Sequence, residues 1–210
     1  SIQTDINNVH SMVKTWVENS ENTTVPWCVA SDEIGGANIG VAADSDYSGS
    51  TGSEPDNRDQ VRHQTLYGSL FAGGYGVEYY FGYDTGETDL TCEDFRSRKT
   101  KWEDAKIAYD FFNEYLPFWE MDNSDELLTN TDAFCFSKVN EVYAVYLPPN
   151  QNTDIDIGNS GETFEVKWFN PITGGDLQNG SINSIDANGV VNLGSPPNSN
   201  PEQDWLVLIS

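Results

Sequence analysis

Two short apolar segments of the chain are each followed by acidic or aromatic side chains, and these residues have the types and spacing that chemistry needs. The first segment, 25–30, is apolar without strict alternation, as expected of a strand covered on both faces, and it runs directly into Ser31, Asp32 and Glu33. Functional side chains gather where parallel strands end, because the loops there form a pocket. We therefore expect Glu33 just beyond the end of a buried strand, where its carboxylate either takes part in chemistry or holds a backbone amide or an arginine. If strand geometry continues, Asp32 points the other way and orients a neighbour.

The second segment, 76–82, is also predicted to be a strand, and its side chains alternate between two faces. Tyr79 and Phe81 fall on the face that packs against helices. Glu78 and Tyr80 fall on the other face, and Tyr83 follows the strand. An aromatic ring beside a carboxylate at the mouth of a strand suits a ligand with an apolar face and a polar rim. Glu78, Tyr80 and Tyr83 are therefore candidate binding residues.

Other kinds of site find less support. An acidic cluster after the second strand could ligate calcium through oxygen atoms, but it lacks EF-hand spacing, and a solvated face paired with basic residues is the alternative. The cluster is Asp84, Glu87, Asp89, Glu93 and Asp94, and the basic residues are Arg96, Arg98 and Lys99. Neither His10 nor His63 lies near a recognisable nucleophile motif, and three scattered cysteines suit neither a disulfide framework nor a zinc site. No metal ligand is assigned, and no cofactor is expected apart from the calcium alternative.

The amino-acid composition argues against nucleic acid and anionic membranes as binding partners. Among 210 residues, 34 Asp and Glu face 10 Lys and Arg, so the net charge is −24. Binding nucleic acid or an anionic membrane through surface charge needs a basic patch, and none is visible. No apolar run approaches the roughly 18 residues of a membrane helix. Hydrophobic residues make up 37% and aromatic residues 12%, which is too many for a disordered acidic tail. We expect a globular chain without a nucleic-acid or membrane partner.

Three amphipathic helices are predicted, over 6–18, 58–72 and 97–116. A long loop, 34–56, precedes the second, and Asp56 or Asn57 would cap it. Pro117 ends the third, which is the clearest of the three. The stripes predicted to face inward are Ile6, Val9, Val13, Trp16 and Val17 in the first helix, Val61, Leu66, Leu70 and Phe71 in the second, and Ala105, Ala108, Tyr109, Phe112, Tyr115 and Leu116 in the third.

The pattern of apolar and turn-forming residues changes after about residue 122. Short apolar segments are separated by turns rich in Pro, Gly and Asn, as is typical of a small antiparallel sandwich. The segments are 132–137, 141–147, 153–157, 163–169, 181–185, 189–193 and 204–209. We therefore place one domain over residues 1–121 and a β-sandwich over residues 122–210.

Residues 1–121 alternate strands and helices, which indicates an α/β barrel or an open parallel sheet. Two such units cannot close, since a (β/α)₈ barrel takes about 250 residues. The predicted fold class is therefore α/β plus all-β: the C-terminal portion of a (β/α)₈ TIM barrel, then a small antiparallel sandwich. The missing barrel strands would come from an N-terminal segment of the same precursor or from a second chain.

Five stretches carry a family resemblance: VPWCVASDE at 25–33, GGYGVEYYFGY at 73–83, FNEYLPF at 112–118, VYLP at 145–148 and WFNPITGG at 168–175. Together they resemble the C-terminal part of apiosidase-like, clan A type glycoside hydrolases of bacteria. In that family an eight-stranded barrel is followed by a β-sandwich named for collagen binding. The resemblance runs in order over nearly the whole chain and leaves out the first two-thirds of the barrel.

The resemblance implies a secreted or periplasmic retaining glycoside hydrolase that cleaves a polysaccharide or oligosaccharide. Such an enzyme needs two carboxyl groups about 5 Å apart, a nucleophile and an acid/base. The resemblance implies that Glu33, after the seventh barrel strand, is the nucleophile, and that the acid/base follows the fourth strand, outside this chain. Asp32, Glu78, Tyr80 and Tyr83 would then bind the carbohydrate substrate.

A non-catalytic role is the alternative hypothesis. Residues 122–210 would attach the protein to a matrix or glycan, or act structurally, and the barrel portion would be scaffold. Trp168, Phe169 and Trp205 could supply part of an aromatic platform for sugar rings. We expect them instead to fill the core of the sandwich or the seam beside it.

Overall fold

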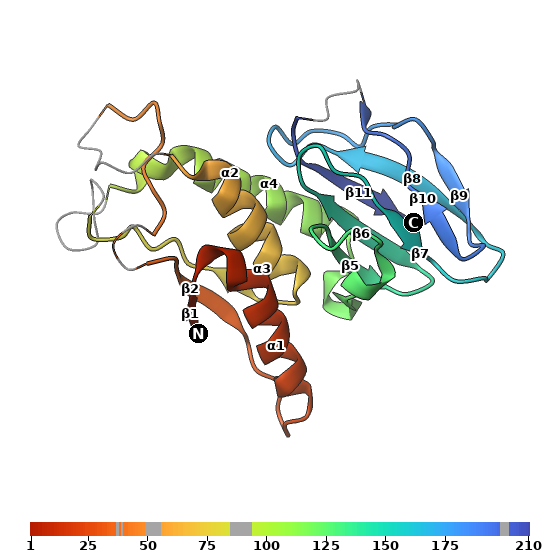
Figure 1. The fold of residues 1–210 in the computed structure, drawn as a ribbon, viewed down its shortest axis with the longest axis horizontal. Helices are drawn as coiled ribbons and strands as arrows, with labels where there is room; N and C mark the ends of the chain where they lie inside the picture. The colour runs from red at the N-terminus through yellow and green to blue at the C-terminus, as the bar shows by residue number, and fades with distance from the viewer. Residues whose placement is uncertain (37, 39, 49–55, 85–93, 198–201) are drawn as a thin grey trace. The chain divides into compact units, whose positions relative to one another are not determined.

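The computed structural model describes residues 1–36, 38, 40–48, 56–84, 94–197 and 202–210. It divides into two compact units, Ser1–Lys106 and Ile107–Ser210. The first mixes helices with a small parallel sheet, and the second consists mainly of antiparallel sheets (Figure 1). Within the described ranges, no helix combines the length and the apolar character needed to cross a membrane.

Three parallel strands form the sheet of the first unit, in the order β1-β2-β3. They are β1 (Ile2–Thr4), β2 (Ala30–Ile34) and β3 (Gly76–Val77). Ser31 of β2 lies opposite Ile2 on one side and Val77 on the other. Parallel neighbours require a crossover connection, and helices supply it both times. The sequence predicted the second and third of these strands but not β1.

The first crossover is the helix α1 (Val9–Glu21), which follows the 3₁₀ turn η1 (Ile6–Asn8). Val9 and Val13 are fully buried in the apolar core of this unit, and Ile6 and Val17 pack against that core. Trp16, predicted to face inward as well, is 42% exposed and lies against the ring of Trp27, with centroids 5.9 Å apart.

The second crossover is one continuous helical segment. It starts as α2 (Arg58–Gln60), widens into the π-helix η2 (Val61–Tyr67) and finishes as α3 (Gly68–Phe71), which lies beside α1 (Figure 1). The helix predicted over 58–72 is therefore confirmed. Three residues of its predicted stripe, Val61, Leu66 and Phe71, are buried, and Leu70 is half-buried.

The third predicted helix is α4 (Lys99–Tyr115), preceded by the 3₁₀ turn η3 (Phe95–Arg98). Its buried stripe is Lys101, Asp104, Ala108, Phe111, Phe112 and, one residue beyond the helix, Leu116. Tyr109 was expected in that stripe but is 65% exposed. The prediction was wrong there because Lys101 and Asp104 occupy the inward positions of the first turns, and the apolar stripe that continues from them passes one residue before Tyr109.

The second unit is a β-sandwich, as its turn-separated segments predicted. A six-stranded sheet has the order β4-β5-β6-β11-β8-β9, and a two-stranded sheet pairs β10 with β7; all of these pairs are antiparallel. The strands are β4 (Asp122–Asn123), β5 (Phe134–Lys138), β6 (Val142–Leu147), β7 (Asp154–Asp156), β8 (Thr163–Phe169), β9 (Ser184–Asp186), β10 (Val190–Asn192) and β11 (Trp205–Ile209). Short 3₁₀ turns, η4 (Phe118–Glu120) and η5 (Asp125–Leu127), precede β5.

Aromatic residues fill both sides of the six-stranded sheet. Trp168 and Trp205 meet edge to face in the sandwich core, with centroids 6.1 Å apart, and both are buried. Phe169, on the other side, packs on Phe111 of α4 at 4.9 Å. The expectation that Trp168, Phe169 and Trp205 fill the interior rather than form an exposed platform is confirmed.

The C-terminal half of α4 belongs to the second unit, because Phe111 and Phe112 pack against Phe169 and Phe136 of its large sheet. The compact units therefore divide within the helix, after Lys106. The division into domains 1–121 and 122–210 stays a prediction, because it concerns modules that fold independently and not the compact units of one structure.

Candidate functional site

Glu33 lies inside β2, one residue before the end of the strand. The sequence placed the strand at 25–30, with Glu33 just beyond it, and this boundary was wrong. The pairing partners explain the difference: β1 and β3 pair with residues between Ala30 and Ile34, and no residue from 25 to 28 pairs with a described strand. Val25 and Trp27 are instead 69% and 48% exposed.

Asp32 sits at an irregularity in β2. Ile2 pairs with Ser31 and the next residue, Gln3, pairs with Glu33, so Asp32 is an extra residue in the ladder. Such a bulge breaks the strict alternation of side chains, and bulges are enriched beside active sites. The expectation that Asp32 simply points away from Glu33 assumed a regular strand, and the strand is not regular there. Both residues are half-buried.

The segment after β3 keeps the predicted alternation although the strand is shorter than predicted. Tyr79 and Phe81 are buried in the core, Glu78 is exposed, and Tyr80 is half-buried. Tyr83 is 50% exposed. Strand β3 ends at Val77 rather than 82, because Tyr80 and Asp84 bond to the loop that follows β2 instead of extending the ladder.

The candidate residues are brought to one edge of the sheet. Because the strands are parallel and Ser31 lies opposite Val77, the residues after these two positions continue in the same direction. The amide of Glu78 still donates to the carbonyl of Ser31, at 2.8 Å. Glu33, near the end of β2, and residues 78–83, after β3, therefore share the edge at which parallel sheets carry their functional groups.

Two backbone hydrogen bonds join the loop after β2 to the segment after β3. The amide of Val41 donates to the carbonyl of Tyr80 at 2.7 Å, and the amide of Asp84 donates to the carbonyl of Asn38 at 2.9 Å. Gly40 makes this approach sterically feasible, since its φ is +54° and a Cβ there would lie 2.3 Å from the carbonyl oxygen of Tyr80. The backbone that carries Tyr80 and Tyr83 is thus fixed by the loop that follows Glu33.

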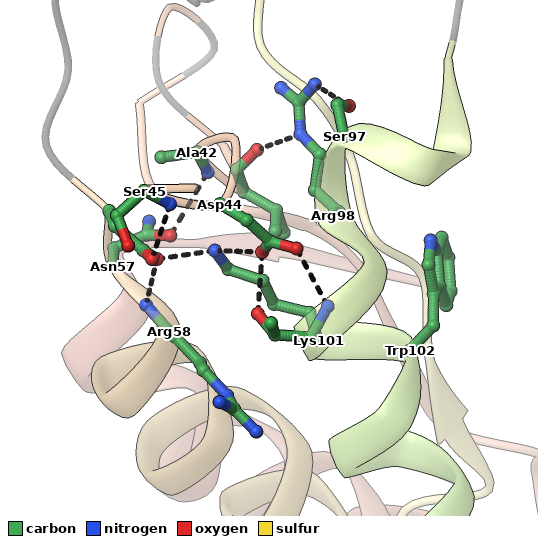
Figure 2. Close-up of polar contacts among 12 residues, drawn as sticks. Ala42, Asp44, Ser45, Asn57, Arg58, Ser97, Arg98, Lys101 and Trp102 are labelled. Carbon is green, nitrogen blue, oxygen red and sulfur yellow. Dashed lines mark hydrogen bonds and ion pairs between the residues drawn. The ribbon is translucent and has the colours of Figure 1, made fainter. Parts of the chain in front are cut away.

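A buried ion cluster anchors this loop to α4 (Figure 2). The ammonium group of Lys101, with no exposed surface, donates to Asp44 at 2.9 Å and to Asp56 at 2.5 Å. Asp44 is itself 3% exposed and accepts from the amide and the hydroxyl of Thr100 at 2.8 and 2.6 Å. Asp56 accepts from the backbone amides of Ser45 and Arg58. Lys101 therefore binds the loop after β2 at two points, Asp44 and Asp56.

A second buried ion cluster is centred on a carboxylate of α4, one helical turn after Lys101. Asp104, 1% exposed, receives two hydrogen bonds from the guanidinium of Arg58, at 2.9 and 2.6 Å. Arg62 of the π-helix approaches the same carboxylate at 3.3 Å and also binds Asp59 at 2.8 Å. Asp104 thereby ties the second crossover helix to α4.

Neither of these two buried clusters was predicted from the sequence. A usable signal was present in α4, where Lys101 and Asp104 occupy positions in line with Ala108 and Phe111 on the apolar stripe. Charged residues on the buried face of a helix are rare unless they are paired. Their partners could not be read from the sequence.

The acidic cluster proposed for calcium lies mostly outside the described residues, which exclude Glu87, Asp89 and Glu93. Asp94 is described, and hydrogen bonds from the side chain of Arg96 hold its pKa at about 2. Arg98, by contrast, is buried, and Lys99 binds Glu103. In the described part of the chain, no group of three or more His, Cys, Asp or Glu side chains is arranged to hold a metal ion.

Replacing Asp56 with asparagine should destabilise the protein in a pH-dependent way. Burial raises the pKa of Asp56, but hydrogen bonds from Lys101 and Ser45 outweigh it and hold the pKa below the ordinary value of 3.8. A lowered folded-state pKa contributes stability that is complete above the unfolded-state pKa and is lost as the pH falls through the folded value. Melting temperatures of Asp56→Asn and of the unaltered protein should therefore differ near neutral pH and converge below pH 3.8.

The matched control is Asp46→Asn, which changes an exposed carboxylate on the same loop and should leave the melting temperature unchanged throughout. A difference between Asp56→Asn and the unaltered protein that stays constant across the acid range would show that the ionised carboxylate is not the stabilising form.

Comparison with known proteins gives one family match and a set of structural matches. Residues 124–210 match the family described as "Putative collagen-binding domain of a collagenase". No curated protein matches the sequence. One similar solved structure is described as a glycoside hydrolase, with 17% identity and a TM-score of 0.64 over 95% of this chain. Another is a glycoside hydrolase family 5 from Bacteroides vulgatus, with 19% identity and a TM-score of 0.66 over 95% of this chain.

These matches concern the fold. The alignments cover 46% and 45% of the two matched chains, so this chain spans a little under half the length of each. The architecture of both units, helices with a parallel sheet followed by antiparallel sheets, is therefore shared with glycoside hydrolases. The sandwich is the part that also resembles a domain named for collagen binding.

Proposed function

We propose that this chain is the C-terminal part of a secreted or periplasmic retaining glycoside hydrolase, with Glu33 as its nucleophile. The observation that carries the proposal is the position of Glu33, at the end of a parallel strand, in a chain whose fold matches glycoside hydrolases over 95% of its length. The apiosidase-like family, suggested by the sequence stretches quoted above, is the finer assignment that we propose.

In this proposal, β1, β2 and β3 with their crossover helices are the last units of a (β/α)₈ barrel. Exposed apolar side chains support the existence of further barrel strands: Val25, Trp27 and Tyr75, which precede β2 and β3, are 69%, 48% and 74% exposed. Large exposed apolar patches on a protein surface often mark a contact surface. We propose that an earlier segment of the same precursor, or a second chain, covers them and completes the barrel.

The proposed reaction has two steps. The Glu33 carboxylate attacks the anomeric carbon while a second carboxyl group, about 5 Å away on one of the other strands, protonates the departing glycosidic oxygen. The same group then removes a proton from water, which displaces Glu33 and regenerates both carboxyl groups. Tyr80 and Tyr83 would stack on the apolar faces of sugar rings, and Asp32 and Glu78 would accept hydrogen bonds from hydroxyl groups.

The stereochemistry of the product tests this mechanism. The intact protein, incubated with para-nitrophenyl glycosides of both anomeric configurations, should hydrolyse one of them and first release a sugar with the same configuration as the substrate. Proton NMR during the first minutes, before mutarotation, measures the configuration. Release of the opposite anomer would exclude a covalent intermediate on Glu33.

A second candidate function is binding to collagen, and the observation that favours it is the family match of residues 124–210. The full chain should then co-sediment with collagen fibrils in a saturable way. Insoluble cellulose and xylan are the comparison matrices, since a glycan-binding sandwich would prefer them. If the chain stays in the supernatant with all three, the sandwich would be a structural support.

A further inference from the structure

The side chain of Arg98 donates hydrogen bonds both to the loop after β2 and to the segment after β3. It has no exposed surface and lies at the end of the turn η3. Its Nε donates to the carbonyl of Val41 at 2.9 Å, on the loop after β2. One terminal nitrogen donates to the carbonyl of Phe81 at 3.2 Å, on the segment after β3. The other donates to the Ser97 hydroxyl at 2.7 Å (Figure 2).

The guanidinium also rests on the ring of Phe81, 4.1 Å from its centroid. A planar guanidinium holds several acceptors in a fixed geometry and stacks on an aromatic ring at the same time, which an ammonium group cannot do. The two carbonyls that it binds flank the direct hydrogen bond from Val41 to Tyr80. Arg98 therefore holds the loop and the segment at a fixed spacing.

The backbone beside Arg98 is itself held in place by hydrogen bonds. The carbonyl of the neighbouring residue, Ser97, accepts the amide of Asp44 at 2.7 Å, and Asp44 is held by Lys101. The start of α4 thus binds the loop after β2 through both backbone and side chains. A displacement of Arg98 would be transmitted to the segment that carries Tyr80 and Tyr83 rather than absorbed by its support.

We infer that Arg98 is a positioning residue, which sets the placement of Tyr80 and Tyr83 relative to Glu33 and thereby the affinity for the sugar substrate. This inference rests on the glycosidase function proposed above. In the proposed glycosidase reaction, Arg98 contacts none of the reacting atoms. Its effect should appear in substrate affinity more than in the chemical step, because the stacking tyrosines are what it holds in place.

Arg98→Lys in the full chain is the test, since it keeps the charge and loses the planar fork. Arg62→Lys is the matched control, because Arg62 is also buried, at 2% exposure, and binds the carboxylates of Asp59 and Asp104. We expect the amides of Val41 and Asp84 to exchange with deuterium roughly tenfold faster in Arg98→Lys, as expected when charge-assisted hydrogen bonds are lost. The KM for a para-nitrophenyl glycoside should rise several-fold with kcat nearly unchanged, and Arg62→Lys should change neither quantity.

Unchanged exchange at both amides would overturn the inference, and so would faster exchange with an unchanged KM. Equal loosening in Arg62→Lys would also overturn it, because the effect would then be general destabilisation. The exchange measurement needs no turnover, so its failure is distinct from failure of the proposed function, which Glu33 variants test. If Arg98→Lys does not fold, Ser97→Ala removes one acceptor of the guanidinium and should loosen the same two amides by a smaller factor.

Discussion

Replacing Glu33 with glutamine is expected to lower turnover of a glycoside by about 10³-fold or more in the assembled enzyme, with folding unchanged. An amide has nearly the shape of the carboxylate but cannot attack the anomeric carbon, so the covalent step is lost while the substrate still binds. Glu33 is half-buried and one residue from the end of β2, so the substitution adds no volume to the core. Initial rates on a para-nitrophenyl glycoside, with the melting temperature measured in parallel, are the readout.

Two further variants make this result specific. Glu18→Gln changes an exposed glutamate on α1 and should leave turnover unchanged. Glu33→Ala should regain part of its activity with sodium azide, because the small anion occupies the vacated space and attacks the sugar in place of the carboxylate. Activity retained by Glu33→Gln would remove Glu33 from the nucleophile role and leave it as a strand-end carboxylate with a structural task.

Replacing Lys101 with methionine should lower the free energy of unfolding by about 3–5 kcal/mol, the usual cost of removing one partner from a buried ion pair. The substitution leaves Asp44, at 3% exposure, without its cation and takes a hydrogen bond from Asp56. The loop after β2 would then lose the contact that joins Asp44 and Asp56 to α4. Urea denaturation followed by tryptophan fluorescence measures the loss.

Lys138→Met is the matched control, because Lys138 also bridges two carboxylates, Glu120 and Glu141, but is 31% exposed. Exposed pairs contribute about 0–1 kcal/mol, so this variant should unfold nearly like the unaltered protein. Adding Asp44→Asn to Lys101→Met should recover part of the loss, since the unpaired charge is then gone. If Lys101→Met and Lys138→Met lowered the free energy of unfolding equally, burial of the Lys101 cluster would not add to its stabilising effect.

Periodicity in the sequence was enough to predict the helices and the sandwich. The stripes in α1, the second crossover and α4 are long enough for a 3.6-residue period to be recognised, and the strands of the sandwich are separated by turn residues. Strand β1 was missed because three residues carry no recognisable period. The start of β2 was misplaced because 25–28 is as apolar as a strand, and pairing partners, not local composition, decide where a ladder begins.

The candidate site was predictable only in outline. The pattern of a strand followed by an acidic residue correctly indicated that Glu33 lies near the end of a parallel strand, and alternation correctly separated Tyr79 and Phe81 from Tyr80. The contacts that hold these residues could not be predicted. Lys101 is separated from Asp44 and Asp56 by a loop and a crossover helix, and only the folded chain brings them together. The hydrogen bonds from Arg98 to the backbone carbonyls of Val41 and Phe81 could not be predicted from the sequence either.

The helix α4 is 17 residues long and contributes side chains to the interiors of both units. Excising the sandwich at the limits of its family match, 124–210, would discard Phe111 and Phe112 and leave the rings of Phe136 and Phe169 facing water. A recombinant fragment with that boundary would be prone to self-association, and its adhesion to any matrix would be hard to interpret. Starting such a fragment at Ile107, so that it keeps the second half of the helix as a lid over the sheet, removes this artefact.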